Sequence, residues 1–199
     1  IGVKTESDAS IIEYSVESST LEDSDILTGN VILESSEEDL EKSFKENGYI
    51  SGKLFVVNKG KKTKNDRIYT ESFVRSLDKD IKDKLSGKFS KESIGSPWPD
   101  LVMYPSHAPT VGGETSDRFL TICSQIVGTI EEGNFWGIEF KTLETTAGKD
   151  MAVLLMKKIV KAVSLRVHIE EATEDSNGNT IVEKGFVEGF GTDFTFKPA

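Results

Sequence analysis

Hydrophobic positions along the chain follow two different spacings. The apolar side chains between residues 68 and 88 recur every four residues, which is the spacing of one face of an α-helix: Phe73, Leu77, Ile81 and Leu85. Gly87 then stands where a helix commonly ends in a left-handed cap. This segment is therefore predicted to be one amphipathic helix.

Most other apolar runs are short and rich in β-branched or aromatic residues, which predicts strands. Two such runs within residues 119–143 flank the turn sequence Glu132-Gly133-Asn134 and predict an antiparallel hairpin. Asn177-Gly178 is a second hairpin signal. Further strands are expected at 29–35, 53–57, 101–104, around Ser164, at 180–190 and at 193–199, and further helices at Glu37–Glu46 and Lys149–Lys161. The low helix count and the succession of hairpins favour a mainly β fold with a few helices, as a barrel or sandwich.

Charge divides the chain into two parts. Residues 1–47 contain 13 acidic and 3 basic side chains, whereas residues 48–199 contain 21 of each, so all of the net charge of −10 lies in the first part. The first part is also rich in serine, and such a composition is typical of a solvated, partly disordered segment. We therefore expect an acidic N-terminal arm or propeptide at 1–47 and a folded domain at 48–199.

Composition also bears on partners and compartment. No basic stripe is present, which disfavours nucleic-acid binding. No run of eighteen apolar residues predicts a membrane span, and the first residues lack the pattern of a secretory signal. A single cysteine, Cys123, excludes an internal disulfide and fits a reducing cytosol, and with only two histidines a His/Cys zinc site is disfavoured. No phosphate-binding loop or other cofactor motif is present.

Ser164 stands in the middle of an apolar, β-branched run, and by itself it predicts only a serine within a strand. A serine becomes a nucleophile when a base removes its proton and a third group orients that base. His168 follows four residues later, about 13 Å away along a strand, so it is too distant to be the direct partner. His107 lies in a Pro/Gly-rich loop, where functional residues concentrate, and is the candidate base.

The order of several short motifs resembles a known family. NDRIYTESF, PSHAP, QIVGTIEEGNFWG, LETTAGKDMAVLL, KAVSLRV and GFGTDFTF follow one another as in the prohead (capsid maturation) proteases of tailed bacteriophages. Those enzymes are serine proteases with the herpesvirus assemblin-like β-barrel fold. The resemblance covers about residues 48–196.

The resemblance implies roles for particular residues. His107 would be the general base, Ser164 the nucleophile, and Arg166 a cation near the oxyanion site. The third member of the triad should come from a strand after the serine, which points to Asp193 or alternatively to Glu188. No cofactor is needed, and a homodimer is implied by the family alone.

The family also implies a setting and substrates. Such an enzyme cleaves scaffold and major capsid proteins, and itself, inside the assembling prohead in the host cytoplasm. Cleavage commonly follows glutamate with a small or aliphatic residue two places before it. Sites of this kind end at Glu13, Glu17, Glu34 and Glu183.

Three departures from the family pattern keep a second hypothesis open. Leu165 replaces the family's second serine, Val167 replaces its glycine, and Ala108 separates His107 from Pro109. Such changes are also compatible with a catalytically silent protease fold that serves as a structural protein of the phage head.

Overall fold

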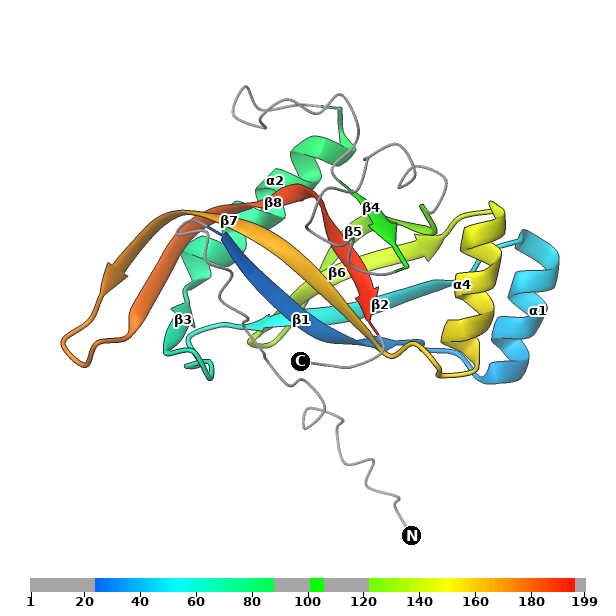
Figure 1. Ribbon diagram of the computed structural model, residues 1–199, viewed down its shortest axis with the longest axis horizontal. Helices are drawn as coiled ribbons and strands as arrows, with labels where there is room; N and C mark the ends of the chain where they lie inside the picture. Colours follow the sequence, from blue (N-terminus) through cyan, green and yellow to red (C-terminus); the bar gives the residue numbers. More distant parts are fainter. Residues whose placement is uncertain (1–23, 88–100, 106–121, 196–199) are drawn as a thin grey trace, which may run out of the picture.

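Strands from the two ends of the described chain pair with each other and close a single sheet (Figure 1). The computed structural model describes residues 24–87, 101–105 and 122–195. The strands are β1 (Ser24–Ile32), β2 (Ser51–Asn58), β3 (Arg67–Tyr69), β4 (Val102–Tyr104), β5 (Ser124–Glu132), β6 (Phe135–Thr142), β7 (Ala162–Glu174) and β8 (Thr180–Thr195). The helices are α1 (Glu37–Asn47), α2 (Glu71–Leu85) and α4 (Thr146–Met156).

The sheet is a barrel rather than a sandwich. Its strands follow the order β8, β4, β5, β6, β2, β1 and β7, and β7 pairs with β8 again, which closes the ring. β3 lies outside this ring and pairs in parallel with β8 at residues 180–182, far along β8 from its pairing with β4. The pattern of the sequence predicts a mainly β fold with a few helices, as a barrel or sandwich, and the family resemblance implies a barrel; the mainly β fold and the barrel are confirmed.

The predicted helices form, with two shifts of boundary. The helix expected from Ile68 begins at Glu71, because Arg67–Tyr69 form the strand β3, which was not predicted. In α2 the Thr70 hydroxyl caps the first turn by accepting a hydrogen bond from the Phe73 N–H. Phe73, Leu77 and Ile81 of the stripe pack into the core, whereas Leu85 at the end of the helix is 45% exposed. α4 runs from Thr146 to Met156 rather than over Lys149–Lys161. Its start is fixed by the Thr145 cap, and Lys158, with a φ of 54°, lies in the left-handed region just after its end.

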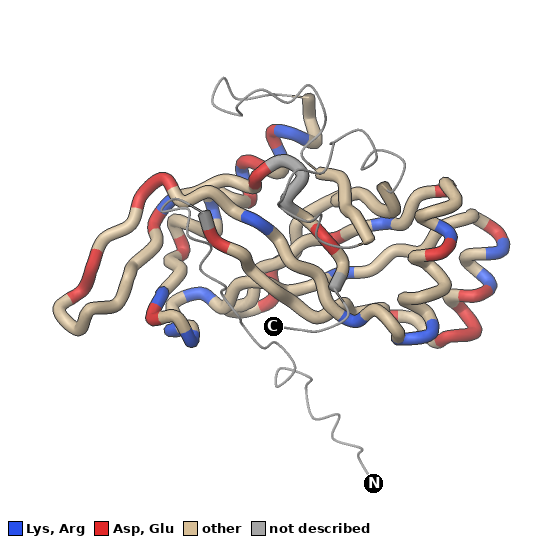
Figure 2. The backbone as a smooth tube through the Cα atoms, viewed as in Figure 1, with Lys and Arg blue, Asp and Glu red and all other residues tan. Residues whose placement is uncertain are grey.

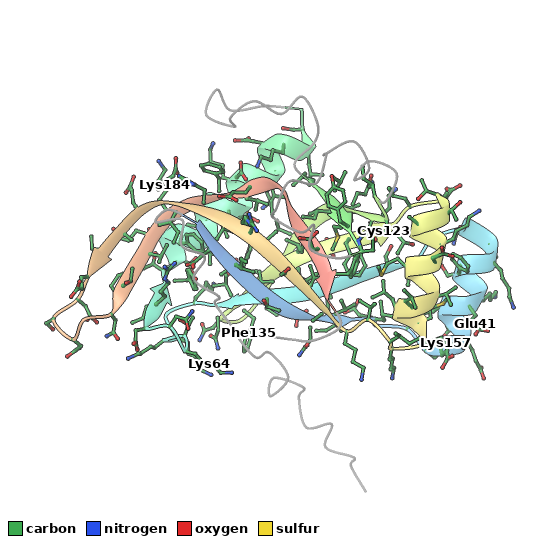
Figure 3. All side chains as sticks on the ribbon, viewed as in Figure 1. Glu41, Lys64, Cys123, Phe135, Lys157 and Lys184 are labelled. Atoms are coloured by element: carbon green, nitrogen blue, oxygen red, sulfur yellow. The ribbon has the colours of Figure 1, made fainter. Side chains whose placement is uncertain are left out.

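The expected boundary at residue 47 does not coincide with the structure. β1 lies inside the range expected to be an acidic arm, yet it pairs with β2 on one side and with β7 on the other. α1 also lies in that range and packs beside α4, where Lys157 forms ion pairs with Glu37 and Glu41 (Figure 3). The barrel thus includes the chain from Ser24 onward, and residues 1–23 lie outside the described part of the chain.

Alternation along each strand separates a core face from an outer face. On β7 the side chains of Val163, Leu165 and Val167 have no exposed surface and belong to the hydrophobic core. Ser164, Arg166 and His168 alternate with them and therefore lie on the outer face. Beyond the barrel, β7 and β8 continue as a projecting hairpin that carries several acidic side chains (Figures 1 and 2).

Candidate functional site on the outer face of β7 and β8

Four polar side chains form a row across the outer face of four neighbouring strands. Ser164 of β7 pairs with Thr28 of β1 on one side and with Asp193 of β8 on the other. Asp193 in turn pairs with Tyr104 of β4. Since directly paired residues point to the same side of a sheet, these four side chains lie next to one another. All four side chains are buried, whereas polar residues on the outer face of a barrel commonly face solvent.

Ser164 and Asp193 are the central pair of this row. Paired Cα atoms in neighbouring strands are roughly 4.5–5.5 Å apart, so the serine hydroxyl and the carboxylate are close neighbours. The Ser164 hydroxyl donates a long hydrogen bond, 3.5 Å, to the backbone carbonyl oxygen of Asp193. Each of the two side chains is only 2% exposed.

The departures Leu165 and Val167 do not cover the serine. Both side chains point into the barrel and have no exposed surface. Ser164 points to the opposite face, because it alternates with them along the strand.

A second group of charged residues lies next to this row, two residues further along β7. The Arg166 guanidinium Nε lies 3.8 Å from Oε2 of Glu188, and Nδ1 of His168 lies 3.8 Å from Oε1 of the same carboxylate. The His168 ring also lies against the ring of Phe186, with centroids 4.8 Å apart.

A large bulge in β8, between Val187 and Thr192, separates Glu188 from Asp193. Val167 pairs with Val187 and Leu165 pairs with Thr192, so two residue steps on β7 face five on β8. Bulges of this kind redirect side chains and are frequent beside active sites. In this arrangement Asp193 is the direct neighbour of Ser164, whereas Glu188 is the neighbour of Arg166 and His168.

His107, together with Ala108 and Pro109, lies outside the described residues. The described chain includes Tyr104 and Pro105 of the preceding segment, and Tyr104 is paired with Asp193. The assignment of His107 as general base therefore remains a prediction.

Cys123 offers no competing nucleophile. Its side chain has no exposed surface and its Sγ donates to the backbone carbonyl of Met103 at 3.4 Å (Figure 3). Burial, with a smaller contribution from the charge of Asp193, raises the pKa of the Cys123 thiol to about 12, against smaller opposing effects of hydrogen bonds. At neutral pH the reactive thiolate is therefore almost unpopulated.

Sequence reasoning found Ser164, Arg166, Asp193 and Glu188 but missed Thr28 and Tyr104. Both come from strands whose pairing partners are distant in sequence, and neither stands in a recognisable motif. Among the described residues, no three His, Cys, Asp or Glu side chains are grouped as metal ligands would be. No described helix is both long enough and apolar enough to cross a membrane.

No protein-family model matches this sequence, and no curated protein sequence matches it. Among solved structures, the chain is similar to the bacteriophage T4 capsid assembly protease, gp21. The TM-score is 0.48 and the identity 17%, over 94% of this chain and 97% of that one.

Proposed function

We propose that this chain is a serine endopeptidase that matures the prohead of a tailed bacteriophage. The observation that carries the proposal is the direct pairing of Ser164 with Asp193 on the outer face of the barrel. The motif order of the sequence and the inaccessibility of the Cys123 thiol support the same assignment.

The chain length between Tyr104 and His107 permits the histidine to serve as the base of this pair. His107 follows Tyr104 by three residues, and three residues of extended chain span at most about 11 Å. Tyr104 itself is paired with Asp193, the proposed orienting carboxylate.

The reaction would follow the usual course of serine acyl transfer. The imidazole of His107 accepts the Ser164 proton while Oγ attacks the carbonyl carbon of the scissile bond. Asp193 orients the imidazole and stabilises its cation, and Arg166 stabilises the tetrahedral oxyanion. The imidazolium then protonates the leaving amine. Water, deprotonated by the imidazole, hydrolyses the remaining ester and frees Ser164.

The substrates in this proposal are scaffold and major capsid proteins, cleaved after x-x-Glu in the prohead within the host cytoplasm, with a homodimer as the active form. Self-cleavage at Glu13 and Glu17 would leave every described strand intact. Glu34 lies two residues after β1, in its connection to α1, and Glu183 lies within β8 beside the fully buried Val182. Cleavage after Glu34 would separate β1 from the rest of the chain, and cleavage after Glu183 would cut β8.

A second candidate function is that of a non-enzymatic head protein with this fold. The 2% exposure of Ser164 favours it, because a nucleophile has to meet its substrate. The two candidate functions predict opposite outcomes of one experiment.

The test is the intact mass of the purified chain over time, beside Ser164→Ala and with a peptide that spans Ile11 to Ser18. Serine protease activity requires cleavage after glutamate by the unaltered chain and none by Ser164→Ala. A loss of about 10⁴-fold or more is expected for the variant. If both proteins and the peptide remain whole at concentrations that favour dimers, the enzymatic proposal is wrong and the structural candidate replaces it.

A further inference from the structure

Glu188 is shared between two basic side chains on the outer face of β7. Its two carboxylate oxygens lie 3.8 Å from Nε of Arg166 and 3.8 Å from Nδ1 of His168. Both separations are longer than a hydrogen bond, and the contact with Arg166 is an ion pair. The carboxylate therefore acts on Arg166 through charge and can tolerate small changes of geometry.

The position of Glu188 depends on the bulge in β8. The bulge begins directly after Val187, which still pairs with Val167, and Glu188 is its first residue. The backbone N–H of Val187 donates to Asp80 at 3.0 Å, and its carbonyl accepts from the buried Lys84 at 2.7 Å. α2 thus anchors the strand immediately before Glu188, which gives the carboxylate a fixed base.

Arg166 has a long, flexible side chain that loses rotamer entropy when it is held in one place. It lies two residues from Ser164 on the same face, about 7 Å along the strand. At 29% side-chain exposure, it is screened from solvent enough for a neighbouring charge to matter. Without a partner the guanidinium would sample positions away from the serine.

From this geometry we propose that Glu188 is a positioning residue, which holds the Arg166 guanidinium beside Ser164. This inference rests on the proposed function, because it gives Arg166 a partner in the same site. Glu188 does not touch the reacting atoms in this role, and Asp193 remains the carboxylate beside the serine. Electrostatic stabilisation is most effective when the charged group is already in place before the reaction.

The test is a double-mutant cycle on peptide cleavage. Glu188→Gln keeps the size of the side chain and removes its charge, and Arg166→Gln removes the cation. We expect Glu188→Gln to lower kcat about tenfold and Arg166→Gln about a hundredfold, with KM changed less than about twofold. Because Glu188 acts through Arg166, adding Glu188→Gln to Arg166→Gln should produce no further loss. Glu188→Asp, which restores the charge, should recover part of kcat.

Glu170→Gln is the matched control. Glu170 lies on the same hairpin, pairs with Lys184 at 3.3 Å and has a side-chain exposure of 25%, against 24% for Glu188. Glu170→Gln removes the same charge at a similar side-chain exposure, and Glu170 lies four residues from Arg166 along β7. Its kcat should equal that of the unaltered chain.

A measurement independent of turnover uses the Nε–H signals of the arginines, of which the chain has only four. The signal that disappears in Arg166→Gln belongs to Arg166. It should shift in Glu188→Gln and remain unchanged in Glu170→Gln.

The outcomes separate the two proposals. Activity in the unaltered chain with full activity and an unshifted Arg166 signal in Glu188→Gln overturns the positioning role and leaves the protease intact. Equal losses in the presence and absence of Arg166 would also overturn it, because they would show that Glu188 acts elsewhere. No cleavage by any form overturns the proposed function, and the positioning role in catalysis with it.

Discussion

At the scale of single residues, Asp25 shows how much one buried charge can depend on its partners. Its side chain has no exposed surface and lies on the face of β1 that points into the barrel. Oδ2 accepts a hydrogen bond from the Tyr69 hydroxyl at 2.8 Å and forms an ion pair with Arg67. Burial raises the pKa of Tyr69, against a smaller opposing effect of the Arg67 charge, so the phenol remains a hydrogen-bond donor.

Asp25→Ala should lower the free energy of unfolding by about 3–5 kcal/mol, because it leaves the Arg67 guanidinium without its partner. Urea denaturation followed by circular dichroism measures this difference. Lys62→Ala is the control, since Lys62 and Asp66 form an ion pair with both side chains more than half exposed, and a change within about 0.5 kcal/mol is expected. Equal stability of Asp25→Ala and the unaltered chain would show that the buried pair contributes nothing net.

Residue-scale features were only partly predictable from sequence. Ser164, Arg166 and Asp193 stand in motifs, and the structure brings the serine and the aspartate together. Asp25 is one of 13 acidic residues in the first 47, and the composition of that segment predicts a solvated arm. Its burial follows from the pairing of β1 with β7, a contact between residues far apart in sequence that local pattern cannot reveal.

At the scale of elements, bulges shape the barrel. β2 and β5 each contain one, and the pairing of β7 with β8 shifts register at three places. The bulge in β2 lies between Phe55 and Val57. Gly137 of β6 pairs with Phe55 at this point. A Cβ atom on Gly137 would overlap the backbone carbonyl of Leu54, so the two strands can approach only because this position has no side chain.

Gly137→Ala should therefore destabilise the fold by about 3 kcal/mol, since backbone rather than a flexible side chain would have to move. Thermal unfolding gives the comparison. The control is Gly133→Asn in the β5–β6 turn, where φ is 59° and nothing lies within 4 Å of an added Cβ. Asparagine tolerates that conformation, and a cost below about 1 kcal/mol is expected. A Gly137→Ala variant as stable as Gly133→Asn would contradict the close approach.

Helices and strands were easier to predict from the sequence than single contacts or the closure of the barrel. The stripe of α2 and the hairpin of β5 and β6 form as expected, because each is encoded within a short stretch. β8 was expected as two strands at 180–190 and 193–199, and it is one strand over Thr180–Thr195 with a bulge. Glycines at 189 and 191 predict an interruption locally, but pairing with β7 continues on both sides of it.

At the scale of the whole molecule, the barrel depends on β1, the first strand of the described chain. β1 lies between β2 and β7, and its residue Thr28 adjoins Ser164. Without it the barrel would open into a sheet with two unpaired edges, and the core on that side would meet water. The closure and the parallel pairings of β8 with β3 and β4 are non-local, so the sequence could favour a barrel or sandwich but could not choose between them.

A chain that begins at Ser24 should therefore unfold cooperatively at a temperature close to that of the full chain. A chain that begins at Ser35 lacks β1 and should show no cooperative transition. Circular dichroism during heating distinguishes the two, and binding of a hydrophobic dye should rise only for the shorter chain. Similar melting of both chains would show that β1 is dispensable.

The pairing of β8 with both β7 and β4 determines when, during synthesis, the barrel can be completed. β8 closes the barrel by joining β7 on one side and β4 on the other, and it is the last strand of the described chain. A ribosome therefore exposes seven strands before it supplies the one that completes the ring. Contacts of such long sequence separation form slowly. During synthesis the chain has neither its core closed nor Asp193 beside Ser164, so any proteolytic activity can begin only after translation has passed Thr195.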